Sequence, residues 1–244
     1  MEWISHGGTG ALIGKSLMTR EQDPKHAAVW WVAAALSPDC IAAATHSLGE
    51  IHRGVAHSLY ALPLLSLFWA AAAWHWGSRR SGPFLRYYLA FLLVVGSHLL
   101  LDALTSYRYS PAWPFSKTAV YWSVMPMFDL FVFVGWAVLL VVRWGRPQRA
   151  RLVSIVGLLV MCTSIGLHLA GKSAVARFEQ PLSGSSGLNA TVRSIPDYWR
   201  PWIWYVHPDS TSKEWSPVNA LSGTMDTTVT MSDPRRIGIG FGGL

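Results

Sequence analysis

Six apolar segments, separated by short polar or basic loops, constrain this chain more than any other feature. They cover residues 3–19, 27–45, 58–76, 85–104, 127–142 and 152–170, and the first is the weakest because His6 and Lys15 interrupt it. A helix needs about 20 apolar residues to cross a bilayer. Only 14% of the residues are charged, against about 25% in soluble domains. The pattern predicts an all-α polytopic membrane protein with five to six apolar helices.

The basic residues predict how these helices are oriented. They gather in the loops at 20–26, 79–86 and 143–151, and short basic loops stay on the cytoplasmic side of a membrane. Six alternating spans then leave the N-terminus outside. The net charge of +7 is explained by these loops, so we expect the lipid bilayer as a partner and no nucleic acid.

The composition changes near residue 170. Ser, Gly, Thr, Pro and Trp become frequent, and short alternating runs at 202–206 and 227–231 are typical of strands. We therefore predict two parts: a helical membrane domain at residues 1–172, and a small extramembrane, β-rich region at residues 173–244.

Histidine and aspartate residues gather at the ends of the apolar segments that this topology places outside. His98 and Asp102 are four residues apart, so on a helix they share one face and suit either a shared metal ion or a histidine–carboxylate pair beside one. A polar pair between packed helices explains them about equally well.

Each of the remaining candidate metal ligands also has an explanation that involves no metal. His52 and His57 cannot share a helical face, but a loop position for His52 and a helix start for His57 would let them converge; otherwise they are interfacial histidines that face water. Asp39 follows Pro38, and a helix break there would place its carboxylate at the interface. A helix-terminal acid is the alternative for Asp39.

Taken together, these residues favour a metal site. Mixed histidine and aspartate ligands suit Zn²⁺, with Mn²⁺ or Fe as alternatives, and such sites activate water for hydrolysis. Arg53 would bind a substrate anion through its guanidinium, or pair with an acid.

An ordered set of motifs gives the chain a family resemblance. The set comprises Ser5-His6, Pro38-Asp39, His52-Arg53-Gly54 with His57-Ser58, His98 with Asp102, Pro114-Phe115-Ser116 and Phe128-Asp129. Over residues 1–140 it resembles the bacterial membrane-bound, metal-dependent hydrolases described as LexA-binding, inner-membrane-associated (YdjM-like). In order and spacing only, it is also similar to the zinc-dependent phospholipase C and single-strand nuclease group.

The first resemblance implies a multi-pass protein of the bacterial inner membrane that is a metal-dependent hydrolase. Its metal ligands would be His6, Asp39, His52, His57, His98 and Asp102, with Asp129 as a further ligand or catalytic base. The chain departs from the family pattern at Ile41, where a second Asp is frequent, at Ala56 for Thr and at Arg108 for Gly. These changes bear on metal number and substrate choice.

Two functions follow. The first is a hydrolase with a metal-activated water at the outer membrane face, acting on phosphoester bonds such as those of phospholipid head groups. The second is a non-catalytic membrane protein that binds or transports a metal, or a scaffold for a partner. A transporter should carry its polar residues near the middle of several spans, whereas here they lie near the ends.

Overall fold

A computed structural model describes most of the helical part of the chain and the centre of its C-terminal part. The described residues are 3–18, 26–45, 51–77, 83–105, 109–120, 122–126, 129, 133, 136, 150–176, 194–197, 202–206 and 216–225, without the side chains of residues 51–53, 150 and 225. All structural statements below concern these residues.

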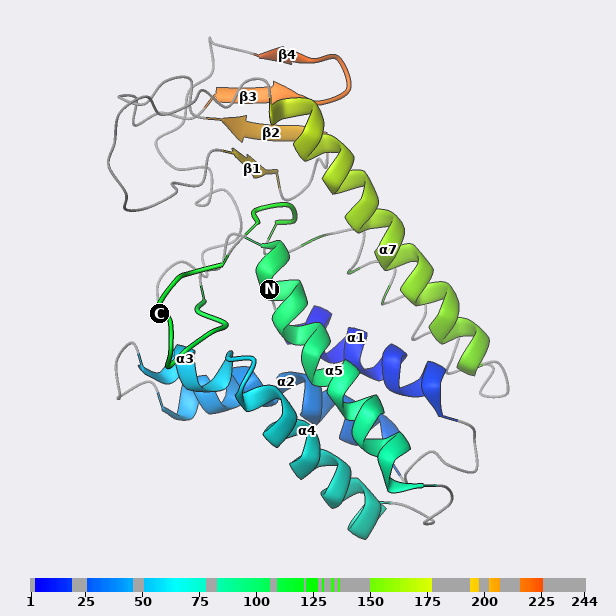
Figure 1. The fold of residues 1–244 in the computed structure, drawn as a ribbon. Helices are drawn as coiled ribbons and strands as arrows, with labels where there is room; N and C mark the ends of the chain where they lie inside the picture. The colour runs from blue at the N-terminus through cyan, green and yellow to red at the C-terminus, as the bar shows by residue number, and fades with distance from the viewer. Residues whose placement is uncertain are drawn as a thin grey trace.

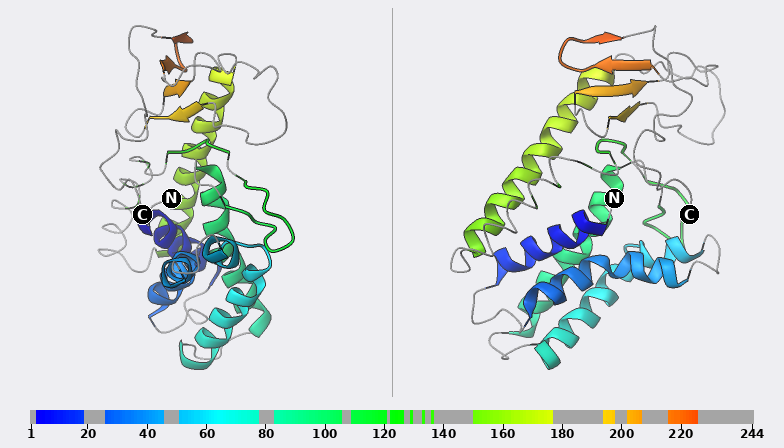
Figure 2. Two further views of the ribbon diagram at one scale, coloured as in Figure 1. Left: turned by 90° about the vertical axis from the view of Figure 1, so that its left-hand side faces the viewer. Right: turned by 180° about the vertical axis from the view of Figure 1, so that it is seen from behind.

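Helices make up most of the described part of the molecule, and a small sheet lies at one end, beside the end of α7 (Figure 1). The helices are α1 (Trp3–Leu17), α2 (Ala27–Ala44), α3 (Ile51–Ala56), α4 (Ala61–Ala72), α5 (Phe84–Leu104) and α7 (Ala150–Val175), and a π-helical turn, η2 (Ala73–Gly77), continues α4. Helix α1 packs against α2, α5 and α7, while α5 also packs against α2 and α4. Helix α1 therefore lies at the centre of the described bundle, as the view from behind shows (Figure 2).

Three of the helices are long and apolar enough to cross a membrane: Ala27–Ala44, Phe84–Leu104 and Arg151–Val175. These correspond to three of the six predicted spans. The predicted spans at 3–19 and 58–76 form helices, but α1 has 15 residues and α4 has 12 before η2 begins. The predicted span at 127–142 lies outside the described residues except for positions 129, 133 and 136. The total of five to six apolar spanning helices thus stays a prediction.

The outer faces of these helices are apolar. Large side chains point away from the bundle and are more than half exposed on α4 (Leu64, Phe68), on α5 (Leu85, Leu93) and on α7 (Leu159, Leu167). Exposed apolar surface of this extent is unfavourable in water and marks a surface that another apolar phase covers. A lipid-facing role explains it, and it agrees with the low charge of the chain.

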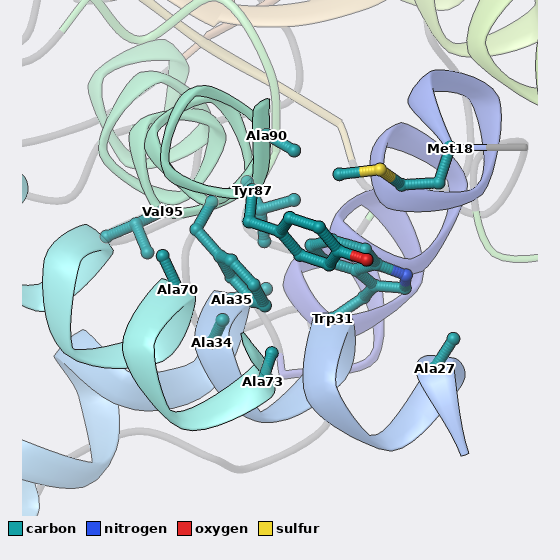
Figure 3. Packing of buried hydrophobic residues seen from close by; sticks show 12 residues of the cluster. Met18, Ala27, Trp31, Ala34, Ala35, Ala70, Ala73, Tyr87, Ala90 and Val95 are labelled. Atoms are coloured by element: carbon teal, nitrogen blue, oxygen red, sulfur yellow. The ribbon is translucent and has the colours of Figure 1, made fainter. Parts of the chain in front are cut away.

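Close packing joins α1 to its neighbours through glycines. A Cβ atom added to Gly10 would lie 2.4 Å from the Cβ of Ala35, and one added to Gly14 would lie 2.2 Å from the Trp31 ring. Small residues let helix backbones approach closely in membranes, where packing rather than water drives association. Trp31 and Tyr87 then fill the space among α1, α2, α4 and α5 (Figure 3).

Helix α2 corrects one expectation. The sequence suggested a helix break at Pro38, but α2 continues through Pro38 to Ala44. A proline lacks the N–H that would bond to the carbonyl four residues earlier, which here belongs to Ala34. The Ser37 hydroxyl donates to that carbonyl at 2.8 Å. The freed acceptor is therefore satisfied locally, as helices in membranes require, and the helix does not need to end.

The C-terminal part contains a four-stranded antiparallel sheet in the order β1 (Ser194–Pro196), β2 (Ile203–Val206), β3 (Ser216–Asn219) and β4 (Thr224–Met225). The small β-rich tail is therefore confirmed, and β2 falls on the predicted run at 202–206. The predicted run at 227–231 lies outside the described residues. The division of the chain into domains at residue 172 stays a prediction.

Two contacts hold the sheet at the end of the bundle where α5 and α7 finish. The Ser123 hydroxyl donates to the backbone carbonyl of Ser194 at 2.9 Å. The Lys172 ammonium donates to the Ser194 hydroxyl and lies 5.8 Å from the centre of the Trp204 ring. Because the segment 122–126 also bonds to the last turn of α5, the sheet is tied to the helix end that carries Asp102.

Candidate metal centre

Four side chains from three parts of the chain meet between the helices. Asp39 comes from α2, His57 from the turn between α3 and α4, and His98 and Asp102 from α5. One ligand atom of each lies within 4.8 Å of the ligand atoms of all the others. We call this group, Asp39, His57, His98 and Asp102, the four-residue cluster.

The spacing within the four-residue cluster matches tetrahedral coordination. Ligand atoms held tetrahedrally at about 2.0–2.2 Å from one ion lie about 3.3–3.6 Å from one another. The Nε2 atoms of His57 and His98 are 3.2 Å apart. Asp39 Oδ1 lies 3.4 Å from His57 Nε2 and 3.5 Å from His98 Nε2, and Asp102 Oδ2 lies 3.4 Å from both nitrogens. These five distances are compatible with one metal ion held by the four side chains.

The orientation of His98 is fixed by the backbone of α2. Its Nδ1 lies 2.8 Å from the carbonyl oxygen of Ala35. A carbonyl only accepts hydrogen bonds, so Nδ1 carries the proton and the lone pair of the neutral ring lies on Nε2, which faces the cluster. This hydrogen bond from the second ring nitrogen is the arrangement that orients metal-binding histidines in proteins.

Burial leaves one side of the cluster open. The side chains of His57 and His98 are fully buried and that of Asp102 is 3% exposed, whereas the side chain of Asp39 is 19% exposed. Among these four side chains, that of Asp39 is therefore the most accessible to solvent.

The carboxylates control the charge of His57. Burial alone disfavours its imidazolium form, but the neighbouring carboxylates of Asp102 and Asp39 outweigh burial and raise the pKa of His57 above 6.5. Tyr109 packs beside His57, with ring centres 6.2 Å apart, and its hydroxyl donates to the Leu99 carbonyl at 2.8 Å. Burial, and then the charge of Asp102, raise the pKa of Tyr109 to about 12, so Tyr109 stays protonated and serves as a hydrogen-bond donor.

His6 of α1 completes this region from the other side of Asp102. Its ring stacks on that of His98, with centres 3.9 Å apart and planes inclined by 24°. Its Nε2 lies 3.1 Å from Oδ1 of Asp102, the oxygen that does not face His57 and His98. His6 is thus adjacent to the four-residue cluster but faces a different carboxylate oxygen.

The structure brings together five of the residues singled out from sequence: His6, Asp39, His57, His98 and Asp102. His52 and Arg53 lie in α3, and their side chains are outside the described part of the chain. Ser58, the residue after His57, accepts a hydrogen bond from the Ala61 N–H at 3.0 Å. This contact at the start of α4 fits the capping role that its position predicts and fixes the turn that carries His57.

Asp129 is not a member of the four-residue cluster. It accepts a hydrogen bond from the Ser164 hydroxyl at 3.2 Å and lies 3.6 Å from Nε2 of His168, both on α7. We call these three residues the α7 cluster. Sequence spacing did not indicate this pairing, since 35 residues separate Asp129 from Ser164. The roles of the Ala35 carbonyl and Tyr109 were likewise not predicted, because neither group belongs to a metal-ligand motif.

The model of the family described as YdjM inner membrane protein matches residues 1–173. The chain belongs to this family. Searches of curated proteins and of solved structures gave no match. The match covers the helical part, including every member of the four-residue cluster, and ends within α7 before the sheet. Membership in the YdjM family agrees with the three candidate spans and places the protein in the inner membrane.

Proposed function

We propose that this YdjM-family protein is an integral membrane hydrolase that uses a divalent metal ion, most suitably Zn²⁺, to cleave phosphoester bonds. The observation that carries the proposal is the spacing of the four-residue cluster, in which five interatomic distances of 3.2–3.5 Å agree with one tetrahedral ion. A bound ion of this kind supplies an activated water and polarises a phosphoryl oxygen.

The burial of the four cluster residues indicates the side from which water and substrate would enter. His57, His98 and Asp102 form the buried wall of the site, while Asp39 lies at its open side. The Asp39 carboxylate, the most exposed of the four, is proposed to accept the proton of a water molecule that enters there. Arg53 stands four residues before His57, and its guanidinium is proposed to bind the substrate anion.

The surroundings of the site favour a substrate from the bilayer, such as a phospholipid. Leu59 and Tyr60 lie two and three residues after His57 and are more than half exposed, and Tyr60 packs edge-on against the exposed Phe115. Aromatic and apolar side chains of this kind lie at the level of lipid head groups. The basic loops support a topology in which this side of the membrane is the outer, extracytoplasmic face.

Metal analysis of the detergent-purified protein tests the metal site. We expect the wild-type chain to retain Zn²⁺ and the variants His98→Ala and Asp102→Ala to lose it, with His75→Ala, an exposed histidine of η2, as the matched control. Full metal content in both cluster variants would overturn the proposal.

Hydrolysis is tested on the same preparations. We expect the zinc-loaded protein to release product from phosphatidylglycerol and phosphatidylethanolamine in mixed micelles, and His57→Ala to lose this activity. A protein that binds zinc but hydrolyses neither lipids nor a chromogenic phosphodiester would instead be a non-catalytic metal-binding protein.

A further inference from the structure

The carboxylate of Asp102 has contacts on both of its oxygens. Oδ2 faces His57 and His98 at 3.4 Å each, within the four-residue cluster. Oδ1 faces Nε2 of His6 at 3.1 Å. Asp102 is therefore shared between two groups of imidazole nitrogens, which is the position of a carboxylate that bridges two metal ions.

His6 has no other described partner that would explain its burial. The residue is 1% exposed, and neither of its ring nitrogens forms an aligned hydrogen bond within the described part of the chain. A buried ring nitrogen without a partner destabilises the fold unless something binds it. The distance to Asp102 Oδ1 is short enough for a hydrogen bond, but the alignment that such a bond requires is missing.

A metal ion bound between Nε2 of His6 and Oδ1 of Asp102 would account both for the burial of His6 without an aligned hydrogen bond and for its short distance to Asp102. Two ligands bound at about 2.1 Å and at a right angle lie about 3.0 Å apart, close to the observed 3.1 Å. The stacking of His6 on His98 holds the two rings side by side. His98 would then bind the ion of the four-residue cluster, and His6 would bind the second ion. Right-angle coordination with two protein ligands leaves several positions for water and substrate oxygens, as in an octahedral Mn²⁺ or Mg²⁺ site.

Charge balance gives a reason for a second ion. Within the four-residue cluster, the two carboxylates of Asp39 and Asp102 neutralise one divalent ion when the histidines are uncharged. A site without net charge has little attraction for an anionic phosphoester, whereas a second divalent ion leaves the site with two positive charges. Two ions about 3.5–4 Å apart also hold the attacking and leaving oxygens of a phosphoryl group together.

We infer that His6 and Oδ1 of Asp102 form a second metal position, bridged by Asp102 to the first, and that this position selects an anionic phosphoester as substrate. The inference rests on the proposed function. It assigns His6 to a separate, weaker position whose open coordination sites receive the phosphate oxygens.

Metal stoichiometry and spin coupling test the second position. The probe is Mn²⁺ added to the chelator-stripped, detergent-purified full chain, followed by metal analysis and electron paramagnetic resonance. We expect wild-type protein to bind two Mn²⁺ per chain with the spectrum of a coupled pair. The variant His6→Phe keeps the ring that stacks on His98 but has no ligand atom, so it should bind one Mn²⁺ with an isolated six-line spectrum. His75→Phe is the matched control and should behave as wild type.

Inorganic phosphate provides the second measurement. We expect its affinity for the Mn²⁺-loaded protein to fall at least about tenfold in His6→Phe, as for the loss of one charge-assisted ligand, and to stay unchanged in His75→Phe. One equivalent of Mn²⁺ in the wild type at saturation, or two in His6→Phe, would overturn the inference.

The outcomes separate this inference from the function on which it rests. Wild-type protein that binds neither Mn²⁺ nor Zn²⁺ contradicts the proposed function itself. Wild-type protein that binds one ion and hydrolyses phosphoesters retains the proposed function and removes only the second position. Should His6→Phe fail to fold, the stoichiometry and the spin coupling of the wild type still decide between one ion and two.

Discussion

The four-residue cluster and the α7 cluster are both buried groups of histidine and aspartate, yet they differ in what they can bind. The four-residue cluster collects ligand atoms from α2, from the turn before α4 and from α5. These atoms all lie within 4.8 Å of one another, and five of the distances between them are 3.2–3.5 Å. In the α7 cluster, Asp129 meets a hydroxyl donor, Ser164, at 3.2 Å, and one histidine, His168, at 3.6 Å. The first arrangement offers four ligands to one ion. In the second, side chains of α7 provide polar contacts to the buried carboxylate of Asp129.

This difference indicates that burial and residue type alone do not identify a metal site. Asp102 and Asp129 are 2% and 1% exposed and each lies near a histidine. What separates them is convergence, because only the four-residue cluster brings two histidines and two carboxylates from separate elements onto one point. The variants below test that distinction.

The largest expected effect comes from matched substitutions in the two clusters. Asp102→Asn removes the charge of a ligand whose Oδ2 lies 3.4 Å from both His57 and His98. We expect zinc affinity to fall by more than about 100-fold, beyond the 10- to 100-fold typical of residues that only orient ligands. Asp129→Asn should change zinc affinity less than about twofold. Competition with a fluorescent zinc chelator measures both, and equal losses in the two variants would contradict the distinction.

The second effect is a dependence of metal binding on pH. The raised pKa of His57 means that the metal-free protein holds a proton there to a higher pH than an ordinary histidine does, and an ion must displace this proton. We therefore expect zinc affinity to rise with pH until the pKa of His57 is passed, by up to about tenfold per pH unit for one released proton. Affinity that stays level between pH 6 and pH 8 would contradict the role of His57 as a ligand.

The stability of the metal-free protein should change in the opposite direction. A group whose pKa is higher in the folded than in the unfolded chain stabilises the fold fully below its unfolded pKa. For His57 this contribution is present below about pH 6.5 and is lost as pH rises through the folded value. Thermal unfolding in detergent after chelation, compared with His57→Gln, measures it.

Much of the four-residue cluster followed from local sequence rules. The helical period placed His98 and Asp102 on one face, and the structure has them 3.4 Å apart. The apolar length of residues 27–45 and 85–104 indicated α2 and α5, whose packing brings Asp39 to the same point. The convergence itself depends on how α1, α2 and α5 cross, which glycines such as Gly10 permit but which no local pattern specifies.

The continuity of α2 at Pro38 and the partners of Asp129 could not be predicted from the sequence, and each has a physical reason. The expected break at Pro38 does not occur because the Ser37 hydroxyl satisfies the Ala34 carbonyl, a compensation that depends on a side-chain rotamer. Asp129 was grouped with the metal ligands because the family resemblance implied it as a further ligand or catalytic base. Its partners on α7 are distant in sequence, so only the packed structure shows that they meet.

The fourth prediction concerns the helix that carries His6. A Cβ added at Gly10 would lie 2.4 Å from the Cβ of Ala35 and 2.9 Å from a backbone oxygen of α2, whereas a Cβ added at Gly166 of α7 meets nothing within 4 Å. We expect Gly10→Ala to destabilise the protein by about 1–3 kcal/mol through overpacking and to weaken metal binding, since Ala35 also orients His98. Gly166→Ala should leave both unchanged. Thermal unfolding and zinc titration of the pair measure these effects, and equal behaviour would contradict the close contact of α1 with α2.

The smallest effect should come from the α7 cluster. Ser164→Ala removes the hydroxyl that donates to Asp129, and leaving a buried carboxylate with one donor fewer costs about 1–3 kcal/mol. Thr163, its neighbour on α7, is exposed and its hydroxyl donates to the Leu159 carbonyl of its own helix, so Thr163→Ala is the matched control and should change stability by less than about 0.5 kcal/mol. Zinc content should stay at the wild-type level in both, because neither residue faces the four-residue cluster. A loss of zinc in Ser164→Ala alone would show that the α7 cluster supports the metal centre, and the two clusters would then have to be treated as one functional unit.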